Sequence, residues 1–134
     1  MITEIENKQK VLFQVALNLG VDLIVLFGSR ADGSSRPNSD FDIAYRSKTP
    51  LESEEDHDLF TALMAYTGSE NLHIVNIRNI KPLFFYEIMR NCKVLYAENM
   101  ENFYSLRAYA FRRFEDEVKP LYKIKFDRLK AEYL

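Results

Sequence analysis

Two aspartates separated by a single residue, Asp40 and Asp42, have the types and spacing to do chemistry. They stand at the start of an apolar stretch with strand character, and residues i and i+2 of a strand project to the same face. Two carboxylates held so close repel each other unless a cation bridges them or one of them binds a proton. Hard divalent ions such as Mg²⁺ prefer oxygen ligands, so the pair is a candidate metal site.

A Gly-Ser pair, Gly28 and Ser29, precedes these aspartates with ten residues in between. It follows an apolar run over 23–27 that has the length of a buried strand. Glycine lets an anion approach the backbone closely, serine adds a hydroxyl donor, and a helical turn from Ser29 to Asp32 would add free backbone N–H groups. A phosphate cradle beside paired carboxylates indicates phosphoryl or nucleotidyl transfer, in which metal ions activate a hydroxyl and neutralise the leaving pyrophosphate.

The elements that position these residues alternate between helical and strand patterns. We expect a helix ending at Gly20, a strand over 23–27, a loop over 28–39 and a second strand from Phe41. The later elements are a helix from Pro50 to Gly68, a strand over 72–77, a helix over 83–90, a strand over 93–96 and a helical segment over 99–134 that Pro120 should kink or divide. This order predicts an α/β (α+β) fold, a small mixed β-sheet with flanking helices. Residues 1–98 would form its core, and residues 99–134 a C-terminal helical extension packed on the core, on a partner or on both.

The composition excludes several classes of protein. The chain has 134 residues and a net charge of -2, so it has no overall basic field, and direct nucleic-acid binding is not expected. Its single cysteine, Cys92, excludes an intrachain disulfide framework and fits a reducing compartment. We find neither a signal-peptide pattern nor a run approaching the roughly 20 apolar residues of a membrane span, and we expect a cytoplasmic protein without membrane contact.

The two motifs together resemble the signature of a known family. Gly28-Ser29, ten residues and then Asp40-x-Asp42 are similar to the hallmark of the minimal nucleotidyltransferase branch of the DNA polymerase β-like nucleotidyltransferases. Residues often seen between the two halves of that signature are also present, namely Arg30, Ala31, Gly33 and Ser39. The resemblance extends over nearly the whole chain and implies a polymerase β-like fold, with residues 72–78 as its third strand.

The resemblance also implies a reaction and a partner. The nucleotide-binding residues would be Gly28, Ser29, Arg30 and Ser39, and the catalytic metal ligands would be Asp40 and Asp42, holding Mg²⁺. Family members with this layout are typically antitoxins paired with a helical HEPN ribonuclease toxin. The implied activity is transfer of AMP from ATP to a toxin tyrosine, with ATP as substrate and the HEPN-type toxin as partner in a hetero-oligomer.

One position departs from the family pattern. The third carboxylate of the family falls on the third strand, where this chain has His73. An imidazole can accept a proton, so His73 could act as a catalytic base. It is a poorer ligand than carboxylate for Mg²⁺ and suits Mn²⁺ better. The other interpretation is a strand histidine with a satisfied hydrogen bond and no part in catalysis.

Three hypotheses follow from these features. The first is an active AMP-transferring antitoxin, and the second is an antitoxin with a degraded site that acts by binding alone. The third, a nucleotidyltransferase for a small molecule such as an aminoglycoside, usually needs a larger acceptor domain than this chain offers. Aromatic and arginine side chains crowd the segment after Asn99, which is typical of protein interfaces. Interleaved acidic residues argue against RNA as its ligand.

Overall fold

The computed structural model describes residues 3–133, so the predicted ranges that start at residue 1 or end at residue 134 extend beyond it. The elements, in chain order, are α1 (Glu4–Leu19), β1 (Val21–Phe27), α2 (Ser29–Asp32), β2 (Phe41–Ser47), α3 (Ser53–Thr67), β3 (Leu72–Asn76), α4 (Pro82–Arg90), β4 (Lys93–Ala97), α5 (Met100–Arg113), the π-helical segment η1 (Phe114–Val118) and α6 (Lys119–Tyr133). The predicted mixed α/β fold is confirmed. Within the described residues, no helix is both long enough and apolar enough to cross a membrane.

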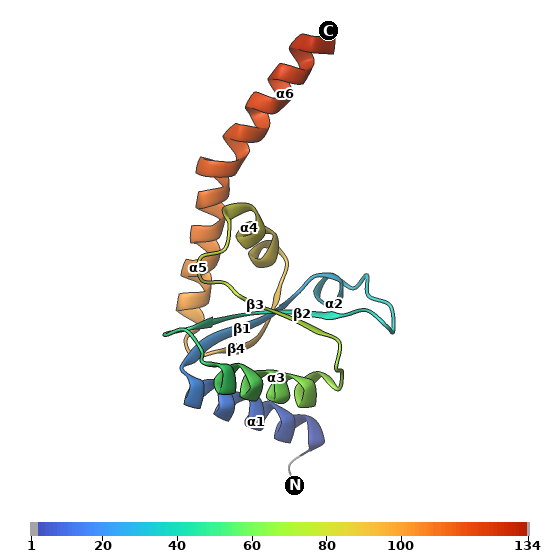
Figure 1. Cartoon of the computed structure of the whole chain (residues 1–134), viewed down its shortest axis with the longest axis vertical. Coiled ribbons are helices and arrows are strands. Elements are labelled where there is room, and N and C mark those ends of the chain that lie inside the picture. The colour runs from blue at the N-terminus through green and yellow to red at the C-terminus, as the bar shows by residue number, and fades with distance from the viewer. Residues whose placement is uncertain (1–2, 134) are drawn as a thin grey trace.

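The sheet lies between two layers of helices (Figure 1). Its strand order is β3-β2-β1-β4, with β1 antiparallel to both neighbours and β2 parallel to β3. Helices α1 and α3 cover one face, while α4 and α5 cover the other. Because β1 is central, its side chains are buried on both faces, which explains why its sequence is continuously apolar from Leu23 to Phe27.

Local sequence signals account for where several helices begin. The Thr3 hydroxyl accepts the Glu6 backbone N–H at 3.2 Å, and the Glu6 carboxylate accepts the Thr3 N–H at 3.3 Å, so the capping box expected from their spacing starts α1. Helix α3 begins at Ser53, not at Pro50 as predicted. Leu51 packs against the core instead, and Glu55 accepts the Glu52 N–H at 3.0 Å at the helix start.

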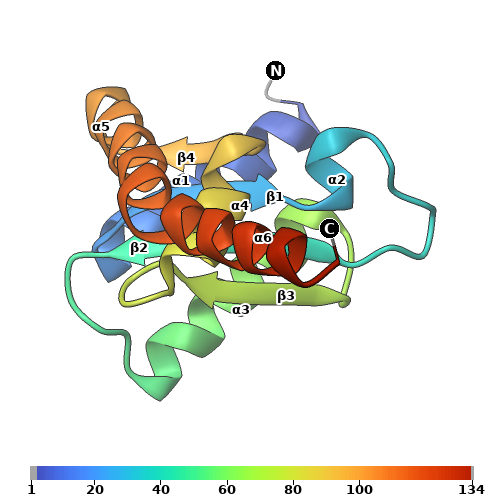
Figure 2. The ribbon, with the colours of Figure 1, turned by 90° about the horizontal axis from the view of Figure 1, so that it is seen from above.

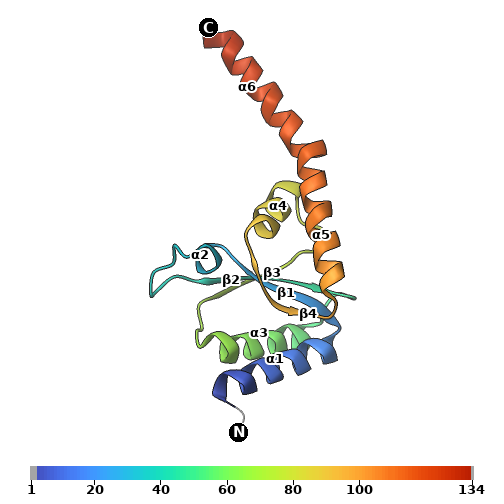
Figure 3. The ribbon, with the colours of Figure 1, turned by 180° about the vertical axis from the view of Figure 1, so that it is seen from behind.

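The C-terminal helical segment is divided, as Pro120 predicts. The wider turns of η1 lie immediately before α6, where the proline cannot donate a backbone hydrogen bond. Helix α5 belongs to the core through Phe103 and Ala110. Helix α6 then projects away from the sheet, as the views from front and back agree (Figures 1 and 3), and residues 119–132 are all exposed.

Candidate functional site

The site begins where β1 ends. Phe27, the last residue of β1, is paired in register with Asp42 of β2, so Gly28 lies against the Asp42 side chain. Gly28 has φ +71°, and a Cβ at this position would collide with the Asp42 carboxylate. Both the backbone conformation and the lack of space therefore require glycine here. The single turn of α2 follows at Ser29, with the N–H groups of Ala31 and Asp32 donating to the Gly28 carbonyl.

The two aspartates flank the first residue of β2. Asp40 immediately precedes the strand and is exposed, while Asp42 is its second residue and is half-buried. Strand alternation puts Asp42 on the side of Ala44, which packs in the core cluster beneath α4 and α5. The Asp42 carboxylate consequently faces the α4 layer, not the α1 and α3 layer.

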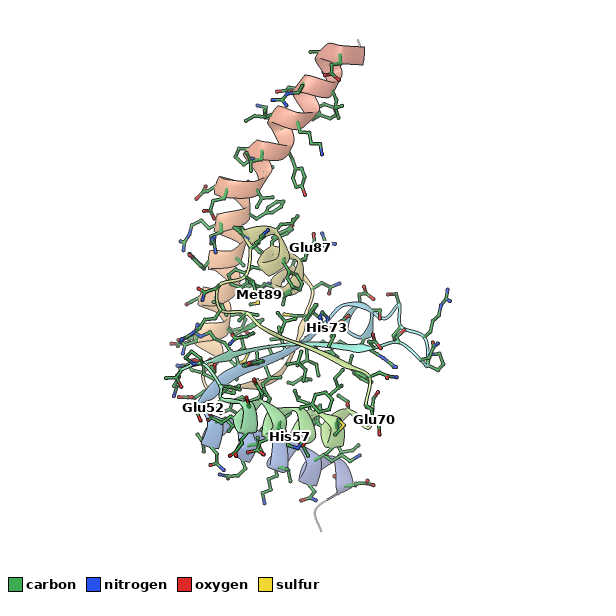
Figure 4. All side chains as sticks on the ribbon, viewed as in Figure 1. Glu52, His57, Glu70, His73, Glu87 and Met89 are labelled. Carbon is green, nitrogen blue, oxygen red and sulfur yellow. The ribbon has the colours of Figure 1, made fainter. Side chains whose placement is uncertain are left out.

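His73 lies directly beside Asp42. The parallel pairing of β2 and β3 matches these two residues, and His73 Nδ1 is 3.3 Å from Asp42 Oδ1. His73 is on the edge strand, and its side chain is 63% exposed against 29% for Asp42. Figure 4 places His73 at the sheet and His57 on α3, outside the site. The sequence position expected for a third carboxylate is thus next to Asp42 in space.

Arg30 is directed into the loop that joins α2 to β2, which extends beyond the sheet (Figure 2). Its Nη2 donates to the carbonyls of Pro37 at 3.2 Å and Ser39 at 3.0 Å. Its guanidinium also lies 4.3 Å from the centre of the Phe41 ring, a cation–π contact. Ser39 is held within the same loop, because its hydroxyl accepts the Arg36 N–H at 2.8 Å. Arg30 and Ser39 therefore shape the loop that delivers Asp40.

Asp32, the other carboxylate of this region, serves the turn after α2. Hydrogen bonds from the Ser34 hydroxyl and from the Ser34 backbone N–H hold the pKa of the Asp32 carboxyl below its ordinary value. Such a side-chain-to-backbone bond two residues on is the usual use of aspartate in a turn. Asp32 does not replace the missing third carboxylate.

The residues present fit one Mg²⁺ ion better than two. Among residues 3–133, no group of three or more His, Cys, Asp or Glu side chains is placed to hold a metal ion. Mg²⁺ is commonly bound by only one or two carboxylates together with substrate phosphates and water. Asp40 and Asp42 meet that requirement, and Gly28 places no side chain on its own side of the Asp42 carboxylate.

Phe84 is a residue near the site that the sequence patterns did not single out. Phe84 lies in the first turn of α4, and its ring makes an edge contact with the Phe27 ring, with centroids 6.1 Å apart. The Phe84 side chain nevertheless remains partly exposed. Its neighbour Phe85 is buried in the core. Adjacent helical residues cannot both face the core, so the Phe-Phe pair was a signal that one ring lies at the surface near the end of β1.

Comparison with known proteins identifies the family and the fold. The sequence model of the family described as "Polymerase beta, Nucleotidyltransferase" matches residues 3–101. No curated protein matches the chain by sequence.

Solved structures share the fold at low sequence identity. A toxin–antitoxin crystal structure with AMP-PNP aligns with TM-score 0.70 and 19% identity, over 90% of this chain and 98% of the other. An MNT antitoxin in complex with tri-AMPylated HEPN toxin, from Shewanella oneidensis, gives TM-score 0.64 and 16% identity over 93% and 98%. An Enterococcus spectinomycin adenyltransferase with ATP and spectinomycin gives 0.50 and 18% over 85% of this chain but 66% of its own.

Proposed function

The chain belongs to the polymerase β nucleotidyltransferase family, and from that premise we propose that it is an antitoxin that transfers AMP from ATP to a tyrosine of a HEPN ribonuclease toxin. The observation that carries the proposal is the meeting of Gly28, Asp42 and His73 at one end of the sheet. The solved complexes with AMP-PNP and with AMPylated HEPN toxin, which have the same fold, support this choice of nucleotide and partner.

In the proposed reaction, Gly28 and Ser29 bind the triphosphate of ATP while Asp40 and Asp42 hold Mg²⁺. The metal, when bound, neutralises negative charge on the phosphates and on the leaving pyrophosphate. The tyrosine oxygen forms a bond to the α-phosphorus, and the bond from that phosphorus to the pyrophosphate oxygen breaks. Arg30 acts on this chemistry indirectly, by holding the loop that places Asp40.

His73 is the proposed acceptor of the tyrosine proton. With its Nδ1–H donated to Asp42, the imidazole leaves Nε2 free to accept a proton. Asp42 would then fix the orientation of the ring and stabilise the imidazolium that forms, as a carboxylate does for a catalytic histidine in other enzymes. The exposure of His73 on the edge strand leaves this proton acceptor accessible to a protein substrate.

Helix α6 is the proposed contact with the toxin. Its large apolar side chains are exposed, and we call them the α6 apolar set: Leu121, Tyr122, Ile124, Phe126 and Leu129. So much exposed apolar surface on one helix marks an interaction site, and a helical partner can cover it by helix packing.

A specific observation favours the second hypothesis, an antitoxin that acts by binding alone. His73 replaces the carboxylate expected of the family, and the described residues hold no cluster of three metal-ligating side chains. The small-molecule hypothesis is weaker, because this chain spans only 66% of the spectinomycin adenyltransferase it resembles.

The deciding experiment is intact-mass spectrometry of a HEPN toxin, encoded beside this protein or co-purified with it, after incubation with the protein, ATP and Mg²⁺. We expect the toxin to gain the mass of one or more AMP groups, and the gain to disappear with Asp42→Asn. Asp58→Asn is the matched control, since Asp58 is an exposed residue of α3 on the other face of the sheet. A tight complex without any mass gain would replace the enzyme proposal with the binding hypothesis.

A further inference from the structure

A cavity of about 350 Å³ opens between the far end of the sheet and α5. Arg46 of β2, Arg78 of the turn after β3 and Arg113 of α5 line it. Arg46 lies four residues along β2 from Asp42, which corresponds to roughly 13 Å at the rise of a β-strand. The cavity is therefore separate from the site at Gly28 and Asp42.

The charged residues that line this cavity are all basic. Its nine lining residues include the three arginines and no acidic residue. Each arginine already has a polar partner: Arg46 pairs with Asp22 at 3.3 Å, Arg78 donates to the Lys48 carbonyl at 2.6 Å, and Arg113 pairs with Glu117 at 2.7 Å. A guanidinium carries five N–H donors in a fixed fork, so each retains donors for a further acceptor.

The remaining lining is apolar and aromatic. Ile77 and Phe85 are buried and form its floor, while the Tyr109 ring is 45% exposed. Tyr109 packs against the Phe85 ring, with centroids 6.2 Å apart, and the guanidiniums of Arg113 and Arg112 lie 5.7 Å and 6.0 Å from the centre of the Tyr109 ring. An exposed ring held in this way offers a face on which a flat ligand can stack.

We infer that this cavity binds a nucleotide-like organic phosphate, a phosphate monoester with a flat, partly apolar body. Arginines bind phosphate oxygens in pairs of parallel hydrogen bonds, which explains three of them around one cavity. Tyr109 supplies the stacking surface for the body of the ligand, and a cavity of this volume is within the range that binds small molecules. This second site does not depend on catalysis at Asp42.

The test is a titration of the full-length protein, followed by ¹H–¹⁵N NMR of assigned backbone amides and arginine side chains. The probes are AMP, inorganic phosphate and a tetraglutamate peptide. AMP should give saturable shifts at Arg46, residues 77–80, Tyr109 and Arg113, with Kd below about 1 mM. The double variant Arg78→Ala with Arg113→Ala should weaken AMP binding at least tenfold. Arg128→Ala, which removes a charge from the exposed helix α6 outside the cavity lining, should not.

Three outcomes would overturn the inference. AMP shifts confined to Gly28–Asp42 would leave only the first nucleotide site. Equal affinity for phosphate and AMP would reduce the cavity to an unspecific anion site. Tighter binding of the peptide than of AMP would assign the arginines to carboxylates of a protein partner.

Discussion

At the level of single residues, the contact between Gly28 and Asp42 can be tested with an internal control. Gly28→Ala adds a Cβ that collides with the Asp42 carboxylate in a left-handed backbone conformation. We expect a stability loss of about 1–3 kcal/mol and, because the carboxylate is displaced, a fall in AMP transfer of about 100-fold or more. Chemical denaturation and the rate of toxin modification measure the two effects.

Gly33→Ala is the matched control for that variant. Gly33 also has positive φ, +85°, but an added Cβ would meet no atom within 4 Å. Gly33→Ala should therefore lower the stability, because of its backbone conformation, without lowering the rate of AMP transfer. Equal loss of transfer in both variants would mean that loop conformation, not the space beside Asp42, is what the reaction requires.

Arg30 separates two interpretations of the residue that follows Gly-Ser. If the Arg30 side chain binds a phosphate of ATP, its removal should raise the KM for ATP. If it only holds the loop in place, its removal should mainly lower kcat. Because Arg30 contacts the carbonyls of Pro37 and Ser39, we expect Arg30→Ala to lower kcat by about 10–100-fold with little change in KM. Hydrogen exchange over 33–39 should rise in parallel, and Arg36→Ala, which removes a charge from the same loop, should change neither. A raised KM with normal exchange would return Arg30 to the nucleotide site.

His73 tests how far the site departs from its family. If the imidazole is a weakened substitute for a carboxylate, His73→Asp should raise the rate of AMP transfer in Mg²⁺ at least about tenfold, the low end of what changes around a metal typically cause. His73→Asn is the control, since it keeps a polar side chain without a charge or a base. No gain from aspartate with either Mg²⁺ or Mn²⁺ would contradict this account of the site.

The limits of sequence reasoning at this scale have a physical origin. Gly28, Asp40 and Asp42 could be predicted as site residues because their roles depend on local geometry. Gly28 marks a turn, and the two aspartates follow the two-residue period of a strand. The pairing of Asp42 with His73 depends on the register of two parallel strands joined through α3, which no local pattern encodes. The contact of the Arg30 guanidinium with the carbonyls of the loop that follows it is likewise not revealed by sequence spacing alone, and the predicted role of Arg30 at the nucleotide stays a prediction.

At the level of elements, the packing of α3 on the sheet predicts an alkaline stability limit. Burial, and then the nearby Asp56 carboxylate, raise the pKa of the Tyr45 phenol above its ordinary value, and its hydroxyl donates to Asp56 at 3.4 Å. The unfolded chain loses this proton first as pH rises, so the stability present below the ordinary tyrosine pKa should fall above it. Tyr45→Phe should reduce this loss of stability, measured by unfolding experiments at pH values from below to above the ordinary tyrosine pKa. Tyr66→Phe, which packs in the same cluster, should leave it unchanged.

Element boundaries were predictable where a cap or a glycine sets them and less so elsewhere. Gly20 and Gly68 end α1 and α3 as expected, both with positive φ. The start of α3 was misplaced, because Pro50 suits a first helical position equally well and the packing of Leu51 decides against it. The sequence predicted that Pro120 divides the last helix, and the structure adds a stretch of π-helix before it.

At the scale of the whole molecule, α6 is an exposed extension that continues the helical path of α5 and η1. It is 15 residues long, and helices of about this length gain most of their stability in proteins from packing of an apolar face. Truncation after Val118 removes no buried residue over the described positions 119–132, so we expect Tm to change by less than about 4 °C, under about 1 kcal/mol. The same truncation should abolish co-purification of the toxin, and calorimetry with pull-down measures both results.

Substitutions within α6 decide whether its apolar set or its charge makes that contact. Tyr122, Phe126 and Leu129 recur at helical spacing, and their combined replacement by alanine should weaken toxin binding by about 2 kcal/mol or more, the scale of an interface hot spot. Replacing Lys123, Asp127 and Lys130 together by alanine is the control, because these exposed residues lie on the same helix without adding apolar area. Equal losses in the two triple variants, measured by calorimetric titration, would show that the apolar set is not the contact. Unchanged binding in both would place the toxin on the sheet domain and leave α6 to a different partner.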